Sequence, residues 1–433
     1  NFKVCTVTRE NYGEVFGTFL SEGDLLIDFA ESVGTREFCE WCAERNIMYI
    51  NTGETDWPDH WYSIFEENGL KRELQEKYRN IPKKNRYPIV LHHGNNPGLV
   101  SHFVKEGISY IARTQFRKDK KLKTMIQKGA FAEAAEYLDI RTIHVNDIDS
   151  QKLKEMPGEG VLISTWCTES YWFELLSEAT VNVGTHESVT NAGEYRSYNE
   201  EKGYLEYYAL AAEKMCRTFY PEGSFTGHVV PHEETVSIAQ SLEVKRDGVV
   251  AYRPTVIFIY RPSPYADAFL RTAKVNEYPN PDPEKPQDCD IPGGEVITRG
   301  YRYPKKDEIL YREKTEEGTE YVGVLIMDSR FDPVWVGNRI EPEFLYKKEA
   351  GSYWQTPTIT PVAMSALSAV CWMIKNQKKG GIYFPDDIPQ YHEIVKFAEK
   401  YISPTLYKTF SKSRVKQAIG TTLTNYTLDE FLV

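Results

Sequence analysis

Strands and helices alternate through the first hundred residues of this sequence, and that alternation constrains the fold more than any other feature. Short apolar runs with the composition of buried strands occupy residues 24–30, 47–51 and 87–92. Helical patterns precede and separate these runs, at residues 11–22, 34–45 and 62–78. Strand–helix–strand repetition predicts a parallel sheet covered by helices, which is the architecture of dinucleotide-binding domains.

A dinucleotide-binding domain normally opens with a strand and a G-x-G-x-x-G turn, because the backbone must approach the pyrophosphate at a helix N-terminus. The sequence contains no such turn, and neither Gly184 nor residues 292–294 have its spacing or setting. The sequence begins at Asn1 rather than at a methionine. We therefore expect a further βαβ segment, on the order of 60 residues and carrying this turn, to precede Asn1 in the native protein.

The pattern changes after residue 97. Segments rich in β-branched and aromatic residues predict the strands of an antiparallel or mixed sheet, at residues 142–145, 161–165, 249–260, 295–302 and 321–327. Residues 277–292 contain five prolines and three aspartates and are predicted to form a loop. A strongly apolar helix is predicted over residues 357–378.

We predict an α/β fold with a Rossmann-like dinucleotide-binding domain of parallel strands over residues 1–97. An α+β catalytic, substrate-binding and dimerisation domain is predicted over residues 98–352. The C-terminal helices, residues 353–433, are predicted to return to the first domain.

Composition excludes some classes of function. The 63 acidic and 52 basic side chains give a formal net charge of −11, which argues against a nucleic-acid surface. The acid excess suits a cationic ligand, and it is equally typical of proteins that need charge only for solubility. No apolar run approaches the ~20 residues that a membrane span needs, so no membrane partner is predicted.

Cysteine usage indicates the compartment. The seven cysteines are scattered rather than laid out as a disulfide framework, which predicts a reducing cytoplasm. Cys39 and Cys42 form a C-x-x-C pair that could serve redox chemistry or a metal. We interpret them instead as core residues on the inner side of a helix, together with Phe38.

The first motif that could contribute to a site is the polar stretch at residues 92–103. It follows a predicted buried strand and opens a helix, so Asn95 and Asn96 are expected at the carboxyl edge of the parallel sheet, where ligands bind. The Asn-Pro-Gly sequence is equally typical of a plain tight turn.

Two further motifs combine aromatic, acidic and imidazole side chains. Trp166 follows a predicted strand and Glu174 comes eight residues later, a pair that could bind an ammonium group or could simply pack. His186-Glu187 and His232-Glu233 offer imidazoles for proton transfer. Neither has the H-E-x-x-H spacing or a nearby cysteine, so no metal is predicted.

Taken in order along the chain, these stretches resemble bacterial homospermidine synthases, a branch of the saccharopine-dehydrogenase-like superfamily. The similar stretches are residues 23–30, 49–57, 94–103, 143–151, 165–174, 184–187, 232–239 and 357–382. The resemblance implies a homodimer that holds NAD as a recycled group. It also implies the reaction, in which putrescine or spermidine gives a hydride to NAD and the imine is captured by putrescine. Ammonia or diaminopropane is lost, and the hydride returns to give homospermidine.

The resemblance also implies which residues form the site. The implied catalytic residues are Asn96, Trp166, Glu174, His232, Asp147 and Glu54. The implied cofactor-binding residues are Asp28, Phe29, Ala30, Glu31, Thr52, Asn95, Asn96 and Pro97.

Each implied catalytic residue has a role. Asn96 would lie beside the nicotinamide and the substrate, and Trp166 would face the middle of the substrate. Glu54, Asp147 and Glu174 would hold ammonium groups. His232 would relay protons. Asp147 is one methylene shorter than the glutamate that this resemblance leads us to expect.

Elementary chemistry agrees with a diamine substrate. A diamine has no carboxylate, so its site should contain acids and an aromatic ring without an arginine clamp. The motif stretches contain no arginine, and their acids include Asp147, Asp149, Glu169, Glu174 and Glu187. A saccharopine-type or carboxynorspermidine-type dehydrogenase, whose substrates carry carboxylates, is therefore the second hypothesis. A non-catalytic NAD-binding regulator is the third.

Overall fold

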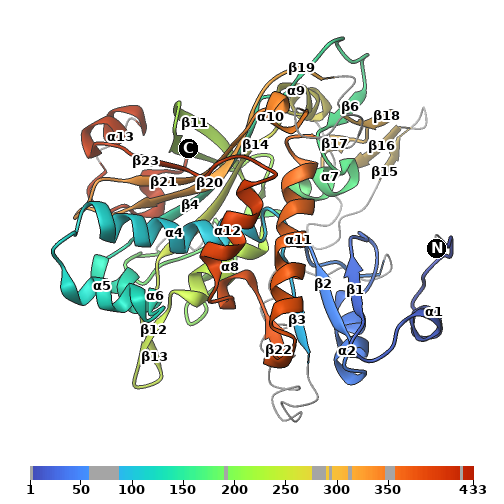
Figure 1. The fold of residues 1–433 in the computed structure, drawn as a ribbon. Coiled ribbons are helices and arrows are strands. Elements are labelled where there is room, and N and C mark those ends of the chain that lie inside the picture. Colours follow the sequence, from blue (N-terminus) through green and yellow to red (C-terminus); the bar gives the residue numbers. More distant parts are fainter. Residues whose placement is uncertain are drawn as a thin grey trace.

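Two sheets organise the protein, and helices cover both of them (Figure 1). The structure is a computed structural model, and it describes residues 3–57, 87–189, 194–275, 289–291, 295–310, 315–346, 356–419 and 423–433. The helix predicted at residues 62–78 lies outside the described residues, as do Pro292, Gly293 and Gly294.

The first sheet is the predicted parallel sheet, and that prediction is confirmed. Its strands are β1 (Leu25–Asp28), β2 (Met48–Asn51), β3 (Pro88–Val90) and β22 (Gly381–Tyr383). They lie in the order β1-β2-β3-β22, and every neighbouring pair is parallel. The carboxyl ends of all four strands therefore meet at one edge of the sheet.

Helices cover this sheet on both faces. The helix α2 (Thr35–Glu44) buries Phe38, Cys39 and Cys42 in a cluster with residues of β2, β3 and β22. Both cysteines are free, and burial raises the pKa of each thiol, so the core interpretation is confirmed. The other face is covered by α11 (Ile359–Lys375), which lies along β2 and β3 in Figure 1. This is the predicted apolar helix returning to the first sheet.

The second sheet has ten strands and forms the largest core. Its main path runs β23 (Leu406–Thr409), β21 (Val334–Ile340), β20 (Glu320–Met327), β4 (Thr142–Asp149), β14 (Thr255–Arg261), β7 (Glu178–Asn182), β9 (Tyr204–Leu210) and β8 (Tyr195–Asn199). β10 (Met215–Tyr220) and β11 (Gly223–Val229) complete it beside β14. β4 and β14 are parallel, and the other described pairs are antiparallel, so a mixed sheet is confirmed for the predicted strands at residues 142–145 and 321–327 and for residues 255–260. The predicted strands at residues 161–165 and 295–302 pair in smaller, separate sheets, as do residues 249–252.

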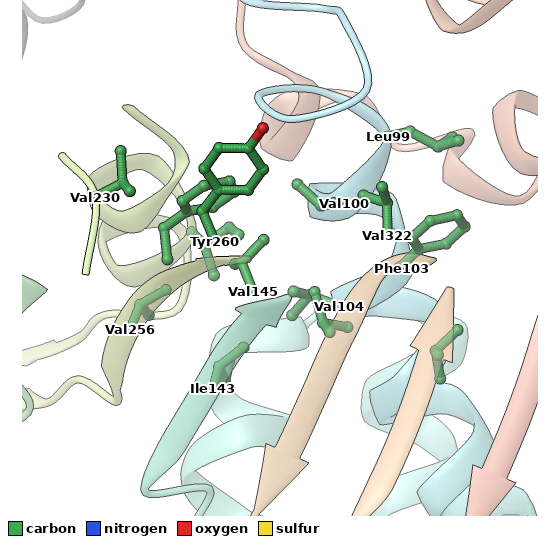
Figure 2. Packing of buried hydrophobic residues seen from close by; sticks show 14 of the residues in the cluster. Leu99, Val100, Phe103, Val104, Ile143, Val145, Val230, Val256, Tyr260 and Val322 are labelled. Carbon is green, nitrogen blue, oxygen red and sulfur yellow. The ribbon is translucent and has the colours of Figure 1, made fainter. Parts of the chain in front are cut away.

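The helix α4 (Leu99–Thr114) joins the two sheets. It begins just after the polar turn that follows β3, and its apolar side packs on the large sheet. Figure 2 shows Val100 and Phe103 of this helix beside Val322 of β20, with Val145 of β4 close by. Burial of this many branched and aromatic side chains fixes the turn before α4 relative to β4 and β14.

The remaining elements lie around these sheets. The other helices are α1 (Tyr12–Phe19), α5 (Lys120–Gln127), α6 (Phe131–Leu138), α7 (Thr168–Leu176), α8 (Glu233–Ser241), α9 (Pro264–Ala273), α10 (Pro342–Tyr346), α12 (Tyr391–Glu399) and α13 (Lys412–Ile419). Two-stranded sheets pair β5 (Lys152–Leu153) with β19 (Thr315–Glu317), β6 (Val161–Ser164) with β18 (Lys306–Ile309), and β12 (Val244–Arg246) with β13 (Val249–Tyr252). A three-stranded sheet contains β15 (Cys289–Ile291), β16 (Glu295–Thr298) and β17 (Tyr301–Arg302).

The structure corrects two sequence predictions. The predicted loop at residues 277–292 contains a strand, β15, in the part that is described, because these residues pair with β16. The C-terminal residues 353–433 do not all return to the first sheet. Although α11 and β22 do so, β23 pairs with β21 and α13 packs on β10 and β11 of the large sheet. The domain boundaries at residues 97 and 352 stay predictions.

No helix among the described residues is both long enough and apolar enough to cross a membrane.

Candidate active site

A cavity of about 640 Å³ lies where the carboxyl ends of β1, β2 and β3 face the carboxyl ends of β4 and β14. Residues that follow the first three strands form one side of it, and residues of the large sheet form the other. Ligands of parallel α/β sheets bind at this edge, because successive strands end there in loops that converge on one space. The cavity is therefore the candidate active site.

All of the predicted site residues line this cavity. From the first sheet come Asp28, Phe29, Ala30, Glu31, Thr52, Glu54, Asn95, Asn96 and Pro97, and from the rest of the chain come Asp147, Trp166, Glu174 and His232. Thirteen side chains spread over more than 200 residues of sequence are thus brought together. Their roles stay predictions.

The turn after β3 is both a tight turn and part of the cavity wall. The N–H of Gly94 donates to the carbonyl of Pro97 at 2.8 Å, and the Asn96–Pro97 peptide bond is cis. Gly98 has φ +134°, and a Cβ there would lie 2.0 Å from the Gly94 oxygen, so only glycine fits. The turn places the Asn96 amide 2.6 Å from Asp147 Oδ2, to which it donates.

One group of ionisable residues, which we call the imidazole wall, consists of His232, Glu174, Glu233 and Glu234. The His232 ring stacks on Phe258 with centroids 4.1 Å apart. Its Nδ1 bonds to the buried carboxylate of Glu234 and lies 3.5 Å from Glu233 Oε2, while Nε2 lies 3.9 Å from Glu174 Oε1. Carboxylates thus approach both ring nitrogens.

Burial and these charges set the protonation of the imidazole wall. Burial opposes the charge on His232, but Glu234 and the other two carboxylates outweigh it and raise its pKa to about 10. Burial raises the pKa of Glu174 to about 8, although His232 acts in the opposite direction. His232 is therefore an imidazolium at neutral pH, which makes it a proton donor.

The other group, which we call the carboxylate wall, consists of Asp147, Asp149 and Glu320. Asp147 and Asp149 lie on β4, and Glu320 lies directly opposite Asp149 on the neighbouring strand β20. One oxygen of each carboxyl group (Asp147 Oδ1, Asp149 Oδ2 and Glu320 Oε2) is buried and has no hydrogen-bond partner among the described residues. Burial raises the pKa of Asp147 to about 7 and of Asp149 to about 6, and it raises the pKa of Glu320 as well.

Trp166 lies on the cavity wall beyond the end of β6. Its indole Nε1 donates to the Tyr260 hydroxyl at 3.1 Å, and the ring packs partly against the main core. This hydrogen bond fixes the indole plane beside the space between the two walls. Glu169, three residues further along, is exposed and is not part of the lining.

Glu54 reaches the cavity from the loop after β2. Its carboxylate lies 2.7 Å from His92 Nε2, and its backbone N–H donates to Glu233 Oε1 at 3.0 Å. It therefore connects the first sheet to the imidazole wall.

The second histidine motif has a structural role. Glu187 accepts hydrogen bonds from the Leu428 N–H at 3.0 and 3.1 Å and from the Thr255 hydroxyl at 2.7 Å. His186 Nε2 lies 3.3 Å from the Tyr426 carbonyl. These contacts attach the C-terminal segment to the large sheet, and neither residue lines the cavity.

The part of the site predicted to bind the cofactor offers both satisfied and free polar atoms. Asp28 accepts from the Tyr49 hydroxyl and from the Ala30 N–H, both at 2.9 Å, so this carboxylate is held in place at the end of β1. Asn95 Oδ1 is buried without a partner among the described residues, and such an acceptor suits an amide-bearing ligand.

Sequence reasoning missed several residues of the cavity. Glu233, Glu320, Phe258 and Tyr260 line it without having been assigned to the site. Glu320 opens a strand and has no motif around it, so no local signal could find it. Phe258 and Tyr260 are two residues apart on β14 and so lie on the same face, and only the parallel pairing with β4 places Tyr260 beside Asp147.

The charge of the cavity is strongly one-sided. Its described lining contains no lysine and no arginine, but it contains seven acids: Asp28, Glu31, Glu54, Asp147, Glu174, Glu233 and Glu320. Ligand atoms of His232, Glu233 and Glu234 lie within 4.8 Å of one another, as metal ligands can. The His232–Glu234 and Glu54–Glu233 hydrogen bonds account for that closeness, and the absence of a metal stays a prediction.

Comparison with known proteins gives a consistent result. No family profile matches the chain. The chain is 24% identical over 409 residues to the homospermidine synthase of Mesorhizobium japonicum, a match that covers 92% of this chain and 78% of that protein. It is also 24% identical over 417 residues to the homospermidine synthase of Blastochloris viridis, with coverage of 92% and 79%.

The fold agrees with these sequence matches. The crystal structure of the homospermidine synthase from Legionella pneumophila in complex with NAD superposes with a TM-score of 0.80. That match covers 100% of this chain and 87% of the other, at 24% sequence identity. The dinucleotide-binding fold class is confirmed, and so is the predicted resemblance to bacterial homospermidine synthases.

Proposed function

We propose that this protein is a homospermidine synthase that uses NAD. It converts putrescine or spermidine to an imine, joins it to a second putrescine with loss of ammonia or diaminopropane, and reduces the product to homospermidine. The similarity to two homospermidine synthases over 92% of the chain supports the proposal, as does the matching fold.

The observation on which the proposal chiefly rests is the charge of the cavity. Seven acids without a lysine or arginine in the described lining suit a ligand that carries positive charges at both ends. A dehydrogenase for carboxylate-bearing amines would need a basic group for that carboxylate. The raised pKa values of Asp147 and Glu320 also suit a cationic ligand, because the carboxylate wall contains no positive charge and a substrate ammonium would supply one.

Each predicted substrate-binding residue then has a definite task. Glu174 and Glu54 hold an ammonium group on one side of the cavity, and Asp147 holds another on the opposite side with Glu320 beside it. The Trp166 ring lies over the middle of the substrate, where its face stabilises positive charge by about 2 kcal/mol when water is excluded.

His232 has the task of a general acid. Ammonia leaves the carbon that bears both nitrogens only after the departing nitrogen is protonated, and the buried imidazolium of His232 can supply that proton from Nε2. Glu174 lies 3.9 Å from Nε2, on the side that faces the cavity. Glu234 on Nδ1 keeps the ring oriented and restores its charge.

The first sheet offers the residues for the cofactor. Asp28, Phe29, Ala30 and Glu31 follow β1, Thr52 follows β2, and Asn95, Asn96 and Pro97 follow β3, as a dinucleotide along the carboxyl edge of the sheet requires. NAD, when bound, would accept a hydride from the amine carbon and return it to the imine carbon. Asn95 Oδ1, which is buried and has no partner in the part of the chain that the structure describes, suits its carboxamide N–H.

Two further properties complete the proposal. The resemblance supports a homodimer, which light scattering on the native protein would test. The scattered cysteines support a cytoplasmic location, and six of the seven are free in the structure.

Product analysis tests the proposed reaction. The native protein is incubated with putrescine and a catalytic amount of NAD, and the amines are identified by mass spectrometry. We expect homospermidine and ammonia without net NADH. Stoichiometric NADH without homospermidine would contradict the proposal, and NADH-dependent reduction of an imine formed with a carboxylate-bearing amine would favour the second hypothesis.

A further inference from the structure

His92 is a buried ionisable residue that the proposed reaction has not used. It follows β3 and directly precedes the polar turn, and its backbone is left-handed with φ +57°. Its N–H donates to Asn51 Oδ1 at 2.8 Å, and its ring meets Phe384 edge-on with centroids 4.7 Å apart. A non-glycine residue in this conformation persists only where its surroundings hold it, so the ring has a fixed direction.

That direction is toward Glu54. His92 Nε2 lies 2.7 Å from Glu54 Oε2, and the two side chains are only 3% and 8% exposed. A contact of this length between buried groups is a strong hydrogen bond, and it is stronger still when the oxygen is charged. The Glu54 side chain is therefore held from behind, with its carboxylate on the cavity wall.

The contact extends to the imidazole wall. The Glu54 N–H donates to Glu233 Oε1 at 3.0 Å, and Glu233 Oε2 lies 3.5 Å from His232 Nδ1. His92, Glu54, Glu233 and His232 thus form one line of contacts from the end of β3 to the proposed general acid. These contacts run from the first sheet to the second, because His92 follows β3 and His232 follows β11.

We propose that His92 is a positioning residue for the substrate ammonium site, acting through Glu54, whose carboxylate it holds toward the cavity. The inference rests on the proposed function, because it gives Glu54 the task of binding a substrate ammonium. His92 itself does not line the cavity in the described residues.

The charge of Glu54 responds to the groups around it. Burial raises its pKa, His92 and Arg36 lower it, and Glu233 raises it. Without the His92 hydrogen bond, the pKa of Glu54 rises further. The charged form that binds an ammonium group is then lost at a higher pH, which a purely structural role for His92 would not cause.

Two substitutions distinguish the hydrogen bond from His92 to Glu54 from the packing of the His92 ring. His92→Asn keeps a residue that tolerates the left-handed backbone, but its amide is too short to reach Glu54. His92→Gln places an amide N–H close to the position of Nε2. His392→Asn is the matched control, because His392 also bonds to a buried glutamate, Glu106, at 2.5 Å, and both lie outside the cavity lining.

The measurements are steady-state kinetics over pH, NAD affinity and thermal melting. For His92→Asn we expect kcat/KM for putrescine to fall about 10- to 100-fold, as loss of a hydrogen bond to a charged group does. The acidic limb of the kcat/KM profile of this variant should move up by about one pH unit. NAD affinity should stay unchanged, and His92→Gln should recover most of the loss. His392→Asn should have the wild-type profile.

The outcomes are distinguishable. An active wild type with an unshifted pH profile in His92→Asn overturns the role of His92 and leaves the proposed function standing. Equal losses in His92→Asn and His92→Gln also overturn it, because the donor would then be irrelevant. A wild type that makes no homospermidine overturns the proposed function itself, and with it the task assigned to Glu54.

Discussion

The imidazole wall and the carboxylate wall both gather buried acids, but only the imidazole wall contains a cation of its own. His232 lies among Glu174, Glu233 and Glu234, and its charge is balanced there. On the carboxylate wall, Asp147, Asp149 and Glu320 each keep a buried oxygen without a partner among the described residues. The first wall is arranged to move a proton, and the second is arranged to receive a positive charge from outside.

This difference has an energetic consequence. A buried ion pair is destabilised strongly when one partner is removed, because the other charge is left unpaired. A buried carboxyl group without a partner already destabilises the folded protein when it is ionised. Removing its charge should therefore increase the free energy of unfolding. The same kind of substitution is thus predicted to have opposite effects on the two walls.

The largest effect is expected for Glu234→Gln on the imidazole wall. Glu234 is fully buried and bonds to His232 Nδ1, so the substitution removes the carboxylate nearest to the imidazolium. Loss of one partner from a buried pair typically destabilises by about 3–5 kcal/mol. Urea denaturation at pH 8 measures this change. A stability equal to that of the wild type would show that the His232–Glu234 pair is not charged.

Glu174→Gln should act on activity rather than on folding. It keeps the shape of the side chain and removes the negative charge that the Glu174 carboxyl carries when it pairs with the substrate ammonium, a contact of about 1.5–3 kcal/mol. We expect kcat/KM for putrescine to fall by tenfold to a hundredfold, with little change in NAD affinity. The exposed Glu169 is the control, because Glu169→Gln should be near wild type. Equal kinetics for the two variants would remove Glu174 from the site.

Trp166→Ala separates a ring that faces the substrate from a ring that packs. Loss of a cation–π contact of about 2 kcal/mol predicts roughly a 30-fold lower kcat/KM, with Trp166→Phe retaining part of it. Trp172 is the matched control, since it is 6% exposed in the main core. Trp172→Ala should instead lose several kcal/mol of stability. Steady-state kinetics and thermal melting of both variants distinguish the two roles. Unaltered kinetics in a folded Trp166→Ala variant would show that the Trp166 ring does not contact the substrate.

The smallest effect, with the opposite sign in stability, is expected for Asp147→Asn on the carboxylate wall. Burial raises the folded-state pKa of Asp147 to about 7, above the unfolded value. Between about pH 4 and pH 7 the folded protein binds the extra proton, so the contribution of Asp147 to stability falls as the pH rises through this window. At pH 8 the substitution should stabilise by on the order of 1 kcal/mol, and at pH 4 it should be neutral. Destabilisation at pH 8 would mean that Asp147 has a partner charge.

The sequence was sufficient for the parts of the site that depend on local pattern. An apolar run followed directly by polar residues marks the carboxyl end of a buried strand, which is why Asn95 and Asn96 could be placed at the edge of the first sheet from the sequence pattern. The same holds for Trp166 after β6. These residues are adjacent in the chain to the strands that position them. Asp28 and Thr52 were implied only by the resemblance to bacterial homospermidine synthases.

Other parts of the site depend on pairings that are distant in the sequence. Glu320 reaches the carboxylate wall only because β20 pairs with β4 in antiparallel register, opposite Asp149. The His92–Glu54 contact joins residues 38 apart, through a left-handed backbone that no pattern indicates for histidine. The C-terminal residues are divided between the two sheets because β23 pairs with β21 of the large sheet. None of these pairings leaves a local signal.

Labelled substrate tests the central claim most directly. The native protein is given putrescine deuterated at both nitrogen-bearing carbons, catalytic NAD and unlabelled water. The account predicts homospermidine that retains all of its carbon-bound deuterium, together with ammonia and no net NADH, because the hydrogen removed from the amine carbon returns to the same carbon. Deuterium-depleted homospermidine, or deuterated NADH formed in proportion to the putrescine consumed, would contradict it.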